Sequence, residues 1–183
     1  MSDLDFIEDA ELRKTLENSI EYISTLFKQS KDTEKEQTEL YKEETYRVII
    51  LYVVSAIEAV LLYFYKVRGE KITYPEYKFV QILPEQFLYK EKEGSSVVVA
   101  VQETMEKKEH QIGLQDLAIF FKGKKLILEK TAIEILELNS LRNTFHFNKP
   151  RTNFTCDLKR VESALELLVR TLQNAPKALA VKK

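Results

Sequence analysis

VIILYVVSAIEAVLLYFY, residues Val48–Tyr65, is the longest apolar run of this 183-residue sequence. It reaches the roughly 17–25 residues that a membrane-spanning helix needs. Glu58 lies inside the run, and a charge at the bilayer centre costs about 2.5–3.5 kcal/mol on insertion scales. We therefore interpret Val48–Tyr65 as the core helix of a soluble bundle against which the other, amphipathic segments pack. A protein that spans the membrane once at this run is the alternative.

Apolar residues at helical spacing predict further helices on both sides of this run. The predicted helices span residues 8–29, 38–68, 114–122, 132 to before Pro150, and 157–174. The stop signals are Gly69, Gly123 and Pro176. Thr131 and Glu134 match a capping box, which predicts a helix start at Ala132. The polar residues 30–44 predict a loop that turns into helix near Thr38.

Residues 71–103 differ from the rest, because Pro75 and Pro84 interrupt them and Tyr, Phe and Val fill the apolar positions. Tyr77–Leu83 and Val97–Val101 are the predicted strands of a small hairpin, although Val97–Val101 could equally begin a helix. The expected fold class is mostly α. It is a single domain over residues 1–183, a four- to five-helix up-and-down bundle with a β-hairpin insertion at about residues 71–110.

Composition and cysteine content exclude several classes of protein. The 44% hydrophobic content is too high for a disordered chain. The acidic amino terminus, MSDLDFIEDAEL, lacks the apolar segment of a signal peptide. Cys156 is the one cysteine, so no intrachain disulfide can form, which suits a reducing compartment. We therefore expect a cytoplasmic protein with no membrane attachment.

Charge is distributed unevenly along the chain, although the formal net charge is only −1. Residues 1–45 hold 13 acidic and 6 basic side chains, whereas residues 111–183 hold 7 acidic and 13 basic side chains. The basic carboxy-terminal part suggests an anionic partner such as RNA. Alternatively, the two parts neutralise each other across the fold or a dimer interface.

The motifs of several enzyme classes are missing. The sequence contains no GxxxxGK[ST], no GxGxxG and no GxSxG. One cysteine and two histidines cannot supply the usual spacing of a Cys/His zinc site. We therefore expect neither a metal nor another cofactor.

One polar cluster, NSLRNTFHFN at residues 139–148, contains side chains that could act in catalysis. Helical spacing puts Asn139, Arg142 and His146 one turn apart on a shared face. A histidine can move the proton of an RNA 2′-hydroxyl or of the leaving oxygen, and an arginine can hold the phosphate. The cluster thus predicts metal-independent phosphodiester cleavage in RNA. Alternatively, its cations only complement the end of a helix dipole.

Basic residues around the cluster could contact the RNA backbone. The predicted RNA-binding residues are Lys130, Asn139, Lys149 and Arg151, with further lysines at 122, 124, 125 and 159 and an arginine at 160. The alternative is an ordinary solvated charged face.

This arrangement resembles the HEPN superfamily, the higher eukaryotes and prokaryotes nucleotide-binding domains. Its helical bundles carry an "aiEall"-like stretch, similar to Ser55-Ala-Ile-Glu-Ala-Val-Leu-Leu62 here. They also carry an Arg–polar–…–His motif near the end of a later helix, similar to Arg142-Asn143-Thr-Phe-His146. Three residues lie between Arg142 and His146, where the superfamily has four to six.

The resemblance implies a homodimer whose paired motifs face a common cleft, and metal-independent RNA cleavage in the active members. By position, Arg142, Asn143 and His146 would be the catalytic residues. The resemblance also implies a toxin or phage-defence role, with a protein partner such as a nucleotidyltransferase-type antitoxin. The alternative that it implies is a catalytically inactive module that binds RNA, nucleotide or protein as a dimeric scaffold.

Overall fold

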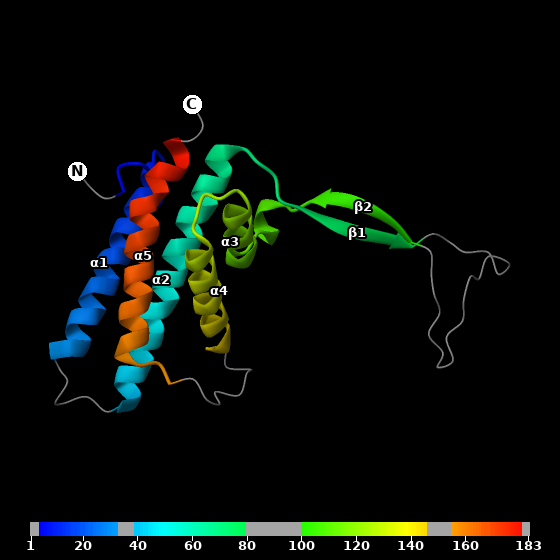
Figure 1. Cartoon of the computed structure of the whole chain (residues 1–183). Helices are drawn as coiled ribbons and strands as arrows, with labels where there is room; N and C mark the ends of the chain where they lie inside the picture. The colour runs from blue at the N-terminus through cyan, green and yellow to red at the C-terminus, as the bar shows by residue number, and fades with distance from the viewer. Residues whose placement is uncertain (1–3, 33–38, 80–99, 146–154, 181–183) are drawn as a thin grey trace, which may run out of the picture. The chain divides into compact units, whose positions relative to one another are not determined.

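The computed structural model describes residues 4–32, 39–79, 100–145 and 155–180. In the described residues the chain is mostly helical, with one antiparallel hairpin, as the sequence predicted. The helices are α1 (Ala10–Asp32), α2 (Glu39–Arg68), α3 (Leu114–Gly123), α4 (Glu129–Thr144) and α5 (Leu158–Ala180), with a short 3₁₀ turn at Glu109–Gln111. The strands are β1 (Thr73–Phe79) and β2 (Ala100–Glu106) (Figure 1).

Two compact units divide the chain. The helical unit comprises residues 1–70 and 113–183, and the hairpin unit comprises residues 71–112. In the hairpin, β1 pairs antiparallel with β2 in the register Thr73 to Glu106 and Phe79 to Ala100. The predicted strand positions 80–83 and 97–99 lie outside the described residues. The alternative of a helix over residues 97–101 is wrong at 100 and 101, which are in β2.

The helical unit is organised around α2, which packs against α1, α3, α4 and α5. The most deeply buried side chains of the unit are concentrated on this helix, and Ile49, Ile50, Val53, Val54, Ile57 and Val60 are fully buried. Aromatic rings extend this core at the end of α2, where Phe64 stacks on Phe6 with ring centroids 5.5 Å apart. The interpretation of Val48–Tyr65 as a core helix is therefore confirmed.

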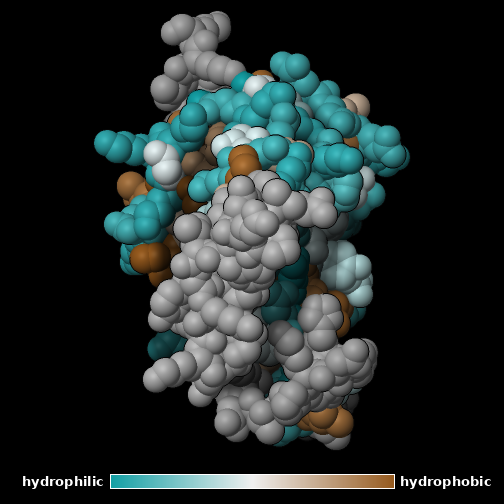
Figure 2. All heavy atoms as spheres, turned by 90° about the vertical axis from the view of Figure 1, so that its right-hand side faces the viewer, coloured by the Kyte–Doolittle hydropathy of each residue, from teal (hydrophilic) through white to brown (hydrophobic). Residues whose placement is uncertain are grey.

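Among the described residues, α2 is the one helix long and apolar enough to cross a membrane. Of its most apolar window, 56% is buried inside the bundle, as in the central helix of a soluble protein. On the face shown in Figure 2, the described surface is mostly hydrophilic and its hydrophobic residues form small separate patches.

The helix ends test the predicted start and stop signals. Gly69 ends α2 as expected, with a left-handed φ of 61° and its N–H donating to the carbonyl of Lys66. After α3 the left-handed residue is Lys125, with φ 56°, and not Gly123, which is the last helical residue. Leu126 N–H donates to the Phe121 carbonyl at 2.9 Å across this turn, which is the bond pattern of a Schellman C-cap.

The predicted capping box at Thr131 and Glu134 is wrong. α4 begins at Glu129 after an extended Leu128, whose carbonyl accepts the N–H of Ala132 at 3.0 Å. Glu129 favours this earlier start, because a carboxylate in the first turn complements the helix dipole. The hydrogen bond from Lys122 to Glu129 holds that carboxylate in place and lowers its pKa.

Two other helix limits differ from the prediction. Ser30, expected in a loop, lies in α1 and is buried. The helix can hold this polar side chain because its hydroxyl donates to the Phe27 carbonyl at 2.8 Å. α5 continues past Pro176 to Ala180. A proline has a helical φ and removes one backbone donor, so the chain can keep helical dihedrals beyond it.

Candidate functional site

Arg142 lies in the last turn of α4 and points toward α2. Its Nη1 donates to Glu58 Oε2 at 3.0 Å, and both side chains are 28% exposed. Glu58 is the charged residue inside the apolar run, so its burial required a partner. The pair joins the middle of α2 to the end of α4.

Glu58 has a second partner at the start of α3. The N–H of Leu114, the first residue of that helix, donates to Glu58 Oε1 at 2.9 Å. The first N–H groups of a helix have no partner within the helix, and a negative charge there is favourable. Glu58 therefore connects three helices: the bond of Leu114 to Oε1 holds the carboxylate, and Oε2 orients the guanidinium of Arg142.

The polar neighbours of Arg142 on α4 are half-buried. Asn143 follows it directly, and Asn139 lies one turn before it. Asn139 Oδ1 is buried and has no hydrogen-bond partner among the described residues. The structure thus places Asn139 and Arg142 one turn apart on α4, as the spacing predicted, and a donor group could still bind the Asn139 oxygen.

His146 lies outside the described residues, which end here at Phe145. α4 itself ends at Thr144, and Phe145 N–H donates to the Arg142 carbonyl at 3.1 Å. The helix predicted to run from Ala132 to before Pro150 therefore ends earlier, at Thr144, because Phe145 is already its cap residue. The predicted RNA-binding residues Lys149 and Arg151 also lie outside the described residues.

The start of α2 holds both ends of the connection between α4 and α5. The guanidinium of Arg47 lies over the Phe145 ring, with its centre 5.8 Å from the ring centroid. Arg47 is itself paired with Glu43 at 2.6 Å and with Glu44 at 2.7 Å. Glu43 Oε1 also accepts the backbone N–H of Cys156 at 3.4 Å. Phe145 before the connection and Cys156 after it are thus anchored on one turn of α2.

Cys156 is buried beside this anchor, and desolvation raises the pKa of its thiol to about 12. Thiolates, and not thiols, are the nucleophiles and metal ligands of proteins. Cys156 is therefore a packing residue and not a reactive one. In the described part of the chain, no group of three or more His, Cys, Asp or Glu side chains is placed to hold a metal ion.

Several lysines of the predicted RNA footprint are engaged by acidic side chains. Lys130 lies 4.0 Å from Glu134 and Lys122 lies 2.6 Å from Glu129. Lys124 pairs with Glu70, which lowers the pKa of Glu70 together with the hydrogen bond from Arg68. These exposed pairs offset part of the positive charge of this region, although such pairs are weak and salt-dependent.

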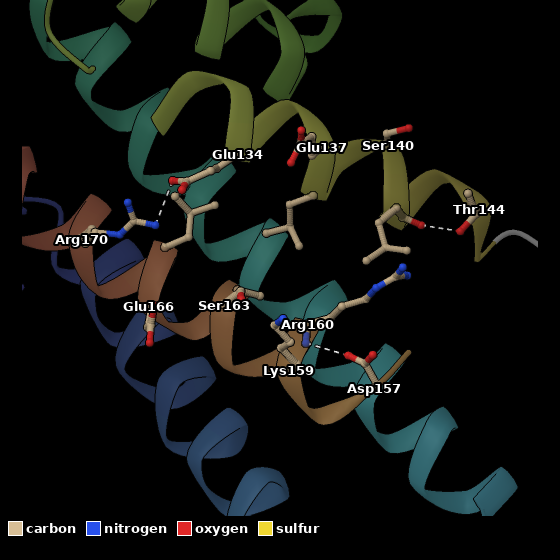
Figure 3. Close-up of a pocket in the computed structure, with 14 residues that line it drawn as sticks. Glu134, Glu137, Ser140, Thr144, Asp157, Lys159, Arg160, Ser163, Glu166 and Arg170 are labelled. Carbon is tan, nitrogen blue, oxygen red and sulfur yellow. Dashed lines mark hydrogen bonds and ion pairs between the residues drawn. The ribbon is translucent and has the colours of Figure 1, made fainter. Parts of the chain in front are cut away.

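Sequence reasoning missed a groove between α4 and α5 with a volume of about 780 Å³ (Figure 3). Its apolar floor consists of Leu138, Leu141, Ala164 and Leu167. Hydroxyl groups of Ser140 and Thr144 on α4 and of Ser163 on α5 line it as well. The leucine stripes of both helices were predicted, but whether the helices close against each other depends on their crossing geometry and not on the stripes.

No protein-family model matches this sequence, and no curated protein or solved structure matches it.

Proposed function

We propose that this chain is a metal-independent endoribonuclease of HEPN type, with Arg142, Asn143 and His146 as its catalytic residues. The observation that carries the proposal is the hydrogen bond between Arg142 and Glu58. It fixes the guanidinium at the end of α4 while the side chain stays 28% exposed. Five N–H donors belong to a guanidinium, so one bond to Glu58 leaves donors for a substrate phosphate.

In this mechanism each residue has a distinct task. Arg142 binds the scissile phosphate and stabilises the negative charge that develops on its oxygens. His146 takes the proton of the 2′-hydroxyl as that oxygen bonds to phosphorus, and a proton is returned to the 5′-oxygen as its bond to phosphorus breaks. Asn143 donates a neutral hydrogen bond to the same phosphate. Arg47 and Glu43 support the site by holding Phe145 and Cys156 at the ends of the segment that carries His146.

A catalytically inactive HEPN-like module is the second candidate, and one observation favours it. Glu58 neutralises the charge of Arg142, and acidic side chains pair with Lys122, Lys124 and Lys130. In that case the Glu58–Arg142 pair only stabilises the bundle. The module would then bind RNA, nucleotide or protein without cutting.

The cellular setting of the proposal follows from the resemblance and the single cysteine. We place the protein in the cytoplasm as a homodimer with a toxin or phage-defence role, opposed by an antitoxin partner. Light scattering of the purified full chain measures the oligomeric state, and a monomer at micromolar concentration would contradict the dimer.

Cleavage of labelled single-stranded RNA in EDTA tests the catalytic proposal. Wild type should cut, whereas Arg142→Ala and His146→Ala should each lose about 100-fold or more in rate, as expected for loss of a charge-stabilising or proton-transferring group. Matched controls are Arg68→Ala, another ion-paired helical arginine, and His110→Ala, the other histidine. Both controls should cut like wild type.

Circular dichroism and gel filtration establish that each variant keeps its fold and oligomeric state. A wild type that cuts none of a varied set of RNAs would favour the inactive module. Equal activity of wild type and Arg142→Ala would remove the HEPN-type assignment of the site.

A further inference from the structure

The groove between α4 and α5 differs at its two ends. At one end, here called the closed end, Arg170 Nη2 on α5 and Glu134 Oε2 on α4 lie 2.9 Å apart and bridge the two helices. The other end, here called the open end, is lined within the described residues by Thr144 on α4 and by Asp157, Lys159 and Arg160 on α5. Arg160 and Arg170 are ten positions apart on α5, so the two ends lie about 15 Å apart.

Charge is divided between these ends as well. Glu137 and Glu166 line the part near the closed end, where a phosphate would be repelled. At the open end, one oxygen of Asp157 accepts the Arg160 N–H at 2.9 Å as the cap of α5. Figure 3 shows the Arg160 side chain extending from α5 across the groove toward the end of α4 at Thr144.

We infer that this groove holds one nucleotide of a single-stranded RNA substrate, next to the bond that is cut. Arg160 binds the phosphate of that nucleotide at the open end, and its base lies over the floor formed by Leu138, Leu141 and Leu167. Ser163 on α5 offers a hydroxyl to the base or the ribose. The inference rests on the proposed function, because it takes RNA as the ligand.

Three features favour a nucleotide over other occupants. The volume of about 780 Å³ lies within the range of roughly 300–1,000 Å³ of small-molecule sites, which are apolar with a few polar groups. The open end, where Lys159 and Arg160 outnumber Asp157, lies at the same end of α4 as Arg142, whose side chain points toward α2. The acidic side chains near the closed end exclude a strand that runs along the groove, so the strand must pass the open end only.

Binding of a fluorescent single-stranded RNA 12-mer tests the inference apart from cleavage. The full chain carrying His146→Ala is titrated in EDTA at several salt concentrations, and anisotropy gives Kd. Arg160→Gln should weaken binding about tenfold at low salt and reduce the slope of log Kd against log salt by about 0.7, the value for one phosphate on a single strand. Arg170→Gln, the matched control at the closed end, should leave that slope unchanged.

A second pair of variants tests the groove itself. Ser163→Trp fills the groove and should weaken binding at least fivefold, whereas Gln173→Trp, exposed on α5 and outside the groove lining, should not. Unchanged Kd in both Arg160→Gln and Ser163→Trp would overturn the inference, even if wild type cuts RNA. Absence of RNA binding by the His146→Ala chain would overturn it too. Binding that depends on Arg160 in a chain that never cuts would support the groove and reject the nuclease.

Discussion

Glu58 and Arg142 are 84 positions apart in sequence and joined by a 3.0 Å hydrogen bond between the middle of α2 and the end of α4. The same carboxylate accepts the first N–H of α3. One acidic residue therefore satisfies an arginine and a helix start together. Removing it leaves both groups without this partner in a half-buried setting.

Glu58→Ala should lower the free energy of unfolding by about 2 kcal/mol, because two donors lose their acceptor. Glu58→Gln keeps an oxygen for Leu114 N–H and should cost about half as much. Urea unfolding followed by circular dichroism measures both values. Glu137→Ala, an exposed glutamate on α4, is the control and should change stability by less than about 0.5 kcal/mol. Equal losses in Glu58→Ala and Glu58→Gln would show that Leu114 contributes nothing.

The two left-handed residues should respond to substitution in opposite directions. Gly69→Ala introduces a side chain at φ 61° and should destabilise by about 1 kcal/mol. Lys125→Gly relieves the same strain at φ 56° and should stabilise by up to about 1 kcal/mol. Thermal unfolding gives both signs. A loss of stability in Lys125→Gly would mean that the lysine side chain makes a contact worth more than the strain.

Helix capping predicts a contrast between Thr131 and Asp157. Thr131 lies inside α4, so Thr131→Ala should change stability by less than about 0.5 kcal/mol. Asp157 caps α5 through its bond to Arg160 N–H, so Asp157→Ala should cost about 1 kcal/mol. The helix content of each variant can be compared by circular dichroism. A larger cost at Thr131 than at Asp157 would restore the capping box.

The thiol of Cys156 should be inert at neutral pH, because burial raises its pKa to about 12. Reaction with iodoacetamide at pH 8 should be far slower in the native protein than in urea. Above the ordinary thiol pKa of 9.0, the unfolded chain loses this proton and the folded chain keeps it. Stability should therefore fall as pH rises from about 9 toward 12, and Cys156→Ala should show a shallower fall. Rapid native alkylation would contradict the burial.

The core role of α2 gives a matched pair on one helix. Ile57 is fully buried, so Ile57→Ala should destabilise by about 2–5 kcal/mol. Ser55, two positions away, is exposed, and Ser55→Ala should be nearly neutral. Both measurements are made without detergent, and the protein should stay soluble under these conditions. A requirement for detergent would support the membrane alternative instead.

Sequence reasoning was most successful where one physical demand dominated. The apolar run around Ile57 needed either a protein core or a membrane around it, and Glu58 inside the run favoured the core and required a partner. Gly69 was recognised as a stop because a left-handed residue after a helix favours glycine. The prediction from sequence failed at Thr131, because the pattern of a capping box also occurs inside a helix. Here the first turn of that helix is stabilised by Glu129 and its ion pair with Lys122.

The candidate site was predictable in part. Arg142 and Asn139 share a helix, so their spacing follows from the sequence, and Glu58 in the apolar run was a possible partner for Arg142, which the structure shows. The approach of Arg160 from α5 to the end of α4 was not predicted. Such contacts depend on how helices cross, which periodicity does not specify.

The position of α2 as the common neighbour of every other helix has a consequence for local opening. Fluctuations that detach α1 or α5 leave the remaining partners of α2 in place. Amide protons near Val53 and Ile57 should therefore exchange with solvent only when the helical unit unfolds as a whole. Their exchange rates would report the global free energy of unfolding, while those at the end of α5 would report fraying alone.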